Sequence, residues 1–169
     1  MDVVATDPDN NLIHVLRNVG GGTFAEVATH STGTNPFALG VGDLNHDHHP
    51  DVVVADYDRN VTVFLNDGSG ALQAAASYLP GGPSALVLTD ADDDGEVDIV
   101  VTNSIYYGAT TNEVSLLLGN GDGSFRPGPS MALEQSPYSM VAGDFDGDGA
   151  ADLAVSDTDR THIFLSEGD

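Results

Sequence analysis

Short apolar runs alternate along the whole chain with turns rich in glycine, aspartate and asparagine. Runs such as Val52–Ala55 and Val61–Leu65 have the length and the β-branched composition of strands, and turn-forming residues stand at both ends of each. No stretch keeps a helical period over an adequate length. The pattern predicts an all-β fold.

One complete unit of four strands is clearest between Pro36 and Leu79. Its expected strands, named A to D in chain order, cover residues 37–42, 52–55, 61–65 and 72–78. An acidic loop joins A to B, a tight turn joins B to C, and a glycine-rich turn joins C to D. Strand A contains small residues that suit a crowded axis, so we expect it to be innermost.

This unit recurs at a spacing of about 50 residues, and four short strands per repeat are the signature of a β-propeller blade. The chain opens at a B strand and stops after a C strand, which predicts one propeller segment, residues 1–169, of about 3.5 blades. The expected blade segments are 1–35, 36–82, 83–136 and 137–169. Such a segment leaves open sheet edges, which tend to pair. We therefore expect either a piece of a longer propeller or a chain that closes a ring with copies of itself.

Three acidic loops of the same pattern join the A and B strands, at residues 43–51, 90–98 and 144–152. Side-chain oxygens at positions 1, 3, 5 and 9 can face one centre, and Ca²⁺ takes six to eight such oxygens at about 2.3–2.6 Å. Position 7 would add a backbone carbonyl. The predicted calcium ligands are Asp43, Asn45, Asp47, His49 and Asp51; Asp90, Asp92, Asp94, Glu96 and Asp98; and Asp144, Asp146, Asp148, Ala150 and Asp152.

Position 6 of these loops is where the chain turns sharply, and glycine is expected there. Gly95 and Gly149 satisfy this requirement, whereas the first loop has His48. We therefore expect the first loop to bind calcium less tightly than the other two. The alternative without metal is an acidic turn in which each aspartate bonds its own backbone.

An EF-hand is the obvious competing interpretation of the acidic loops. It would need a carboxylate at position 12 and a helix on each side. Position 12 is occupied by Val54, Val101 and Val155, each within a strand-like apolar run. The sequence therefore argues against an EF-hand.

Charge and composition narrow the possible partners. The chain of 169 residues has 27 acidic residues, four arginines and no lysine, which gives a formal net charge of −23. This charge argues against binding nucleic acid or an anionic membrane. No run of about 18 apolar residues is present, so we expect no membrane insertion. No cysteine is present, so no disulfide can form. No signal peptide is evident and Asp2 already lies in a strand pattern, so we expect a piece of a longer chain.

Four segments of the sequence resemble the motifs of a known repeat family: Leu117–Phe125, Ser136-Pro137, Val141–Asp144 and Asp144–Asp152. They resemble the FG-GAP/VCBS repeats of the integrin α-subunit propeller, and the resemblance covers essentially the whole chain. It implies a seven-bladed or similar propeller with Ca²⁺ in the loops between A and B strands. Proteins with repeats of this family include integrins, fungal lectins, bacterial surface proteins and some polysaccharide lyases. The chain departs from the pattern at His48, at Leu72 in place of phenylalanine, and in its incomplete first and last blades.

The connection at residues 103–112 is about five residues longer than its counterparts and contains Tyr106 and Tyr107. Because strands alternate in direction, this connection should lie on the face opposite the acidic loops. Aromatic side chains suit sugar rings or protein hot spots, so both tyrosines are candidate ligand residues. The alternative is that one tyrosine packs under its own loop.

We interpret the chain as a non-enzymatic, calcium-binding, extracellular or cell-surface module for recognition or adhesion, with a carbohydrate or protein ligand. No Ser-His-Asp set, P-loop or nucleophile elbow is visible. Asp-x-Asp pairs recur in the B–C turns, which favours a role in the turn over a general acid and base. Two alternatives stay open: a purely structural or engineered propeller fragment that oligomerises into a ring, and part of a polysaccharide-degrading enzyme.

Overall fold

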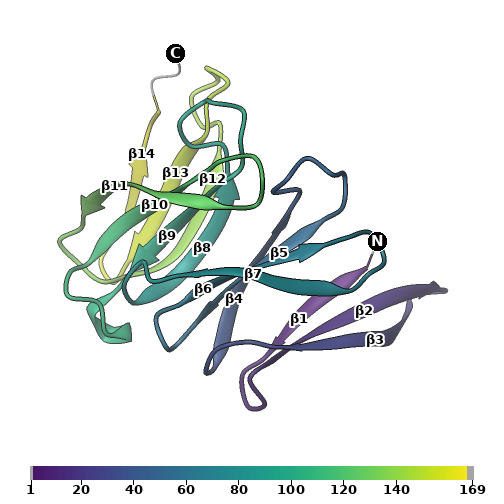
Figure 1. Ribbon diagram of the computed structural model, residues 1–169. Coiled ribbons are helices and arrows are strands. Elements are labelled where there is room, and N and C mark those ends of the chain that lie inside the picture. The colour runs from purple at the N-terminus through teal and green to yellow at the C-terminus, as the bar shows by residue number, and fades with distance from the viewer. Residues whose placement is uncertain (1, 167–169) are drawn as a thin grey trace.

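The computed structural model describes residues 2–166, which form fourteen β-strands and one short 3-10 helix (Figure 1). The elements are β1 (Val3–Asp7), β2 (Leu12–Gly20), β3 (Thr23–Ser31), β4 (Pro36–Gly42), β5 (Asp51–Asp56), β6 (Val61–Asn66), β7 (Leu72–Tyr78), β8 (Pro83–Thr89), β9 (Asp98–Asn103), η1 (Ile105–Tyr107), β10 (Glu113–Gly119), β11 (Phe125–Ala132), β12 (Pro137–Gly143), β13 (Asp152–Asp157) and β14 (Thr161–Phe164). Met1 and residues 167–169, at the ends of the first and last predicted blade segments, lie outside the described residues. No helix among the described residues is long and apolar enough to span a membrane.

The strands form four antiparallel sheets, which we call blades 1 to 4. Blade 1 contains β1–β3, blade 2 contains β4–β7, blade 3 contains β8–β11 and blade 4 contains β12–β14. Within each blade the strands lie side by side in chain order. The strands β4, β8 and β12 are neighbours across the blades and form the inner row (Figure 1). This arrangement confirms the predicted all-β propeller architecture, and the ring is not closed.

Three apolar clusters hold neighbouring blades together. Blades 1 and 2 share a cluster that includes Ile13 and Phe64, and blades 3 and 4 share one that includes Val114 and Val155. The largest cluster lies between blades 2 and 3 and includes Val63 and Val101. The core of the molecule is therefore a series of interfaces between sheets, because each sheet offers apolar residues on both of its faces.

Proline opens each inner strand, at Pro36, Pro83 and Pro137. Pairing with the second strand of the blade is irregular just after each of these prolines. Proline has no backbone N–H to donate to a neighbouring strand. A bulge beside the proline therefore falls where the ladder already lacks one hydrogen bond.

The structure contains one element that the predicted strand map lacks. Residues 105–107 in the long connection form a single 3-10 turn, where only a loop was expected. The Ser104 side chain accepts a hydrogen bond from the N–H of Tyr106, and Gly108 ends the turn at φ 88°. A turn of three residues is too short to leave a helical period in the sequence.

Candidate metal-binding loops

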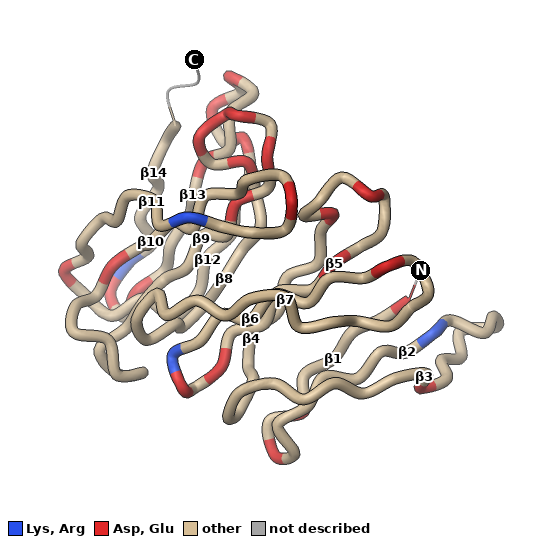
Figure 2. Tube along the Cα trace, viewed as in Figure 1, with Lys and Arg blue, Asp and Glu red and all other residues tan. Residues whose placement is uncertain are grey.

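The three acidic loops join the first and second strands of blades 2, 3 and 4. Figure 2 shows acidic positions gathered in such loops and turns rather than along the strands. The acidic loops lie on the same face of the molecule as the glycine-rich turns. The N–H of Gly123, in the turn of blade 3, donates to the carbonyl of Leu44, in the loop of blade 2, at 2.8 Å. This contact runs from blade 3 to blade 2, so the acidic loop of blade 2 lies beside the glycine-rich turn of blade 3.

Each loop is closed by hydrogen bonds from its own backbone. The carboxylate at position 1 accepts the N–H of position 6, at 2.9 Å for Asp43 and Asp90 and at 3.1 Å for Asp144. The carboxylate at position 5 accepts the N–H of position 7, at 2.8–2.9 Å in the three loops. The turn therefore has one conformation in three different sequences, because the same polar atoms close it.

Position 6 has a left-handed backbone in all three loops, with φ of 66° at His48, 89° at Gly95 and 96° at Gly149. This is the conformation that the glycine pattern predicts. His48 adopts it with a side chain, which costs free energy that glycine avoids. The first loop is therefore built like the others but with a strained residue at its sharpest turn.

The aspartate at position 9 has a structural role that the spacing alone did not reveal. Asp51, Asp98 and Asp152 have no exposed surface. One oxygen of each accepts the N–H of loop position 2, at 2.7–2.9 Å, and the other accepts the N–H of the residue that ends or follows the third strand, at 2.7–2.8 Å. Each of these carboxylates therefore ties its loop to the third strand of its own blade.

Burial raises the pKa of Asp51, and the nearby carboxylates of Asp47 and Asp43 raise it further, against the N–H donors of Asn66 and Leu44. Burial also raises the pKa of Asp98, for which Asp92 and Asp94 are the neighbouring charges. Carboxylates crowded in this way favour a cation among them, because an opposite charge stabilises the ionised form of every member.

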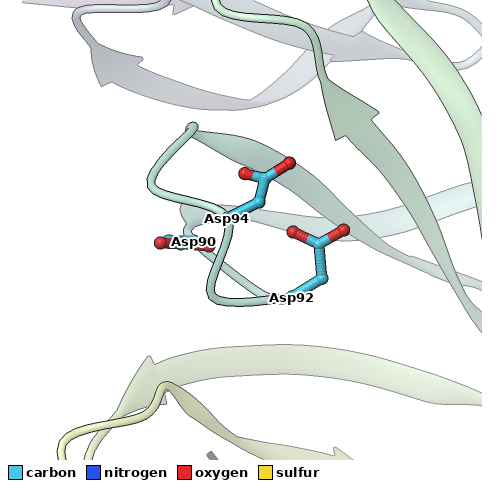
Figure 3. Close-up of side chains that lie close together, drawn as sticks. All are labelled: Asp90, Asp92 and Asp94. Carbon is cyan, nitrogen blue, oxygen red and sulfur yellow. The ribbon is translucent and has the colours of Figure 1, made fainter. Parts of the chain in front are cut away.

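The donor set of two loops fits a hard divalent cation. One oxygen from each of Asp90, Asp92 and Asp94 lies within 4.8 Å of the other two (Figure 3), and Asp144, Asp146 and Asp152 form a second such group. In Figure 3, Asp92 and Asp94 extend to the same side of their loop. Oδ1 of Asp90 is buried and has no hydrogen-bond donor among the described residues. Carboxylate oxygens are the ligands that Ca²⁺ prefers.

The first loop differs from this arrangement. It brings together no comparable group of three carboxylate or imidazole atoms among the described residues. Its position 3 is Asn45, whose amide donates to Asp47 at 3.0 Å. Two histidines of the first loop, His46 and His48, also point away from a shared centre of ligand atoms. His46 bonds Glu96 of the next loop at 2.5 Å, and the His48 side chain is 93% exposed. The loop therefore offers fewer free anionic oxygens than the others.

The residues predicted at position 7 of the loops occupy three different surroundings. The Glu96 side chain bonds His46, the His49 imidazole lies against Gly68 of the neighbouring turn, and Ala150 is buried. None of the three residues belongs to a group of convergent anionic atoms. Their participation through a backbone carbonyl stays a prediction.

The two tyrosines of the long connection have different surroundings. Tyr106 is 75% exposed. Tyr107 stacks on Phe37 of blade 2 with ring centroids 5.8 Å apart and meets the edge of Tyr57 at 6.3 Å. Tyr107 thus packs against the neighbouring blade and not under its own loop, which leaves Tyr106 as the freer aromatic surface.

The aspartates of the B–C turns stabilise their turns. Asp7 accepts the N–H of Asn10, Asp56 accepts that of Asn60, and Asp157 accepts that of Arg160. Backbone N–H groups and a bond to His162 lower the pKa of Asp157 to about 2. A carboxylate held ionised in this way is a poor general acid near neutral pH.

The sequence matches the model of the FG-GAP-like repeat at residues 1–54, 43–101 and 90–155. Curated relatives include cartilage acidic protein 1 of Homo sapiens, which is 26% identical over 165 residues that cover 89% of this chain and 25% of the relative. The Mus musculus protein of the same name is also 26% identical, and the Xenopus tropicalis protein is 25% identical over 167 residues. The chain spans about a quarter of the length of these relatives.

Solved structures show a similar fold. The crystal structure of BBS1N in complex with ARL6DN, soaked with lead, matches 98% of this chain and 52% of that chain with a TM-score of 0.68 and 11% identity. The same complex soaked with mercury matches 95% of this chain and 45% of that chain, with a TM-score of 0.64 and 19% identity. The four blades thus superpose on about half of a solved β-propeller chain. The three consecutive sequence matches and the blade architecture show that the chain belongs to the FG-GAP-like repeat family.

Proposed function

We propose that the chain is a calcium-binding β-propeller module of an extracellular recognition protein. The observation that carries the calcium part is the convergence of carboxylates in loops 90–98 and 144–152. Asp90, Asp92 and Asp94 would hold one ion, and Asp144, Asp146 and Asp152 would hold another. A bound cation would supply the positive charge that offsets repulsion within each group. The proposal includes a weaker site in loop 43–51.

Thermal unfolding with calcium and with a chelator tests this proposal. Extracellular calcium modules bind at about 10⁻⁴–10⁻³ M. At ten times Kd an occupied site adds about 1.4 kcal/mol, which raises Tm by about 3–6 °C in a chain of this size. Asp92→Asn and Asp146→Asn should each reduce the gain. The matched control is Asp122→Asn, because Asp122 lies in a neighbouring glycine-rich turn and, among the described residues, its carboxylate accepts hydrogen bonds from Ser124 alone. A melting temperature that is the same with calcium and with chelator contradicts the proposal.

The recognition part of the proposal rests on the face opposite the acidic loops. Tyr106, Tyr57 and Leu79 are large apolar side chains exposed on this face. A shallow groove of about 240 Å³ lies nearby and is lined by residues that include Arg59 and Thr110. Aromatic faces beside polar donors suit either a sugar ring or a protein hot spot.

An array of neutral and acidic glycans, probed with the labelled protein, tests this part. We expect binding that Tyr106→Ala abolishes while calcium affinity is unchanged. Val19→Ala is a suitable control, because Val19 is also exposed but lies at the end of β2, remote from this face. Binding that survives Tyr106→Ala contradicts a role for this tyrosine. An array without any binding favours a protein ligand or the purely structural alternative.

The proposed setting is extracellular, supported by the likeness to relatives named for cartilage and by the millimolar calcium that weak sites require. We propose no catalytic activity. The repeated aspartates of the B–C turns are engaged with their own backbone, which suits structure better than acid–base chemistry. An assay for cleavage of acidic polysaccharides would reveal the third possibility, a domain of a degrading enzyme.

A further inference from the structure

Arg59, in the B–C turn of blade 2, is an unpaired cation in a strongly acidic chain. The chain has 27 acidic residues against four arginines. Arg160 pairs with Glu134 at 2.8 Å, and Arg126 lies 3.9 Å from Asp92. The exposed guanidinium of Arg59 forms no ion pair or hydrogen bond with the described residues. It is therefore available to an anion from outside the chain.

The backbone at Arg59 adopts a conformation that costs free energy for an arginine. Its φ is 72°, in the left-handed region. In the B–C turn of blade 1 the left-handed residue is Asn11, a residue type that tolerates this conformation. Residues held in such a conformation cluster at ligand sites, where the surrounding structure fixes the position of their side chains.

The side chain of Arg59 lines a groove of about 240 Å³ where blades 2 and 3 meet. We call it the Arg59 groove, and its other lining residues are Leu79, Gly81, Gly108, Ala109 and Thr110. The guanidinium lies against the backbone of Gly108, since a Cβ at this glycine would be 2.8 Å from Nη2 and 3.1 Å from Cζ of Arg59. Blades 2 and 3 both have all four strands, so neither wall belongs to an incomplete blade.

Aromatic and hydroxyl groups accompany this arginine. Tyr107 stacks on Phe37 and meets the edge of Tyr57, and these contacts fix the long connection beside the turn that carries Arg59. Tyr106, two residues before Gly108, is 75% exposed. The Thr110 hydroxyl has no hydrogen-bond partner among the described residues. An exposed ring, a free hydroxyl and a cation together suit a sugar that carries a negative charge.

We propose that the Arg59 groove binds an oligosaccharide with an isolated carboxylate, such as a terminal uronic acid. This inference rests on the proposed recognition function and names the class of ligand for that face. The planar guanidinium offers two parallel N–H donors to the two carboxylate oxygens. Tyr106 provides a face on which the sugar ring stacks.

The charge of the chain favours an isolated carboxylate over a polyanion. A formal net charge of −23 repels an extended polyanion along its whole length. A single carboxylate at Arg59 is affected mainly by nearby groups, because salt screens exposed charges beyond about 8 Å at physiological ionic strength. Asp58, next to Arg59 in the turn, has a carboxylate that accepts the N–H of Thr34 at 3.2 Å. The groove is also smaller than the pockets of about 300–1,000 Å³ that enclose drug-sized ligands, which suits one sugar ring.

NMR titration of the arginine Nε–H groups tests the proposal, because the chain has only four arginines. Methyl glucuronide should shift the Arg59 signal saturably. It should bind about tenfold or more tightly than methyl glucoside, which has a hydroxymethyl group in place of the carboxylate. Arg59→Asn should remove this preference without lowering Tm, because asparagine tolerates the left-handed backbone. Arg17→Gln is the matched control and should keep the preference, because the Arg17 guanidinium lies near Gly70 in a glycine-rich turn, on the opposite face.

The outcomes separate this inference from the proposed function. Equal binding of the two sugars, lost in Tyr106→Ala, leaves the recognition face intact and overturns the role of Arg59. A short acidic peptide that binds Arg59 more tightly than methyl glucuronide assigns the groove to a protein ligand and overturns the sugar class. An Arg59 signal that neither sugar shifts in large excess also overturns the inference, while the calcium dependence of Tm remains a separate test of the calcium sites.

Discussion

The buried carboxylate of Asp98 accepts a hydrogen bond of 2.7 Å from the backbone N–H of Gly119, which lies 21 residues further along the chain. Its other oxygen accepts the N–H of Ala91 at 2.9 Å. The same pair of bonds recurs at Asp51 and Asp152. Position 9 thus connects an acidic loop to the end of a strand through protein atoms alone, so its contribution to stability does not require a metal.

Asp98→Asn should lower the free energy of unfolding by about 1–3 kcal/mol even in chelator, because one buried N–H loses its acceptor. Asp92→Asn is the matched control. Asp92 lies exposed in the same group of carboxylates, and removing its charge relieves repulsion. Denaturant titrations with chelator present check this difference. An equal loss in both variants would show that the two positions act in the same way.

His48→Gly should stabilise the first acidic loop. His48 has φ 66° where the other loops have glycine, and relief of this strain exceeds the loss of an exposed contact with Asp43. The greater freedom of glycine in the unfolded chain offsets part of the gain, so we expect a net increase of up to about 1 kcal/mol. The reverse change, Gly95→His, should cost a similar amount in the second loop. Unfolding in chelator measures both, and a loss of stability in His48→Gly would refute the strain argument.

Much of the fold could be predicted because each blade repeats the same chemical pattern. Glycine at position 6 predicts a left-handed residue, and even His48 adopts this conformation because the surrounding hydrogen bonds fix the turn. Apolar runs such as Val52–Ala55 predict buried strands because both faces of each sheet are covered. Local sequence was sufficient here because each of these features depends on residues close together in the chain.

Contacts between blades could not be predicted in the same way. The stacking of Tyr107 on Phe37 joins residues of different blades, and no spacing in the sequence reports on it. The partners of Asp98 are backbone N–H groups, which every residue except proline has, so they leave no trace in composition. The bond between His46 and Glu96 likewise depends on how two loops approach each other. These features arise from the packing of repeats and not from the repeat itself.

Tyr107→Ala should destabilise the chain, whereas Tyr106→Ala should not. Tyr107 makes two aromatic contacts with blade 2, and such pairs contribute about 0.5–1.5 kcal/mol each beyond the area that they bury. Tyr106 is exposed, so its removal should change stability by less than about 0.5 kcal/mol. Thermal and denaturant unfolding of the two variants give the comparison. Equal losses would mean that Tyr106 also packs, and its assignment as the free recognition surface would then be wrong.

The stability of blade 1 should depend on the protonation of His14. Glu26 first, and then Asp7, raises the pKa of His14 above its ordinary value through hydrogen bonds and charge, against the effect of burial. The stabilisation of the folded chain by charged His14 is therefore fully present below the unfolded-state pKa of about 6.5. It is lost as pH rises through the higher folded-state pKa. The difference in unfolding free energy between wild type and His14→Gln should shrink over that interval. NMR titration of His14 should also show a lower pKa in Glu26→Gln than in wild type. A difference that stays constant from about pH 6 to pH 9 would mean that the two carboxylates do not bind His14 more tightly in its charged form.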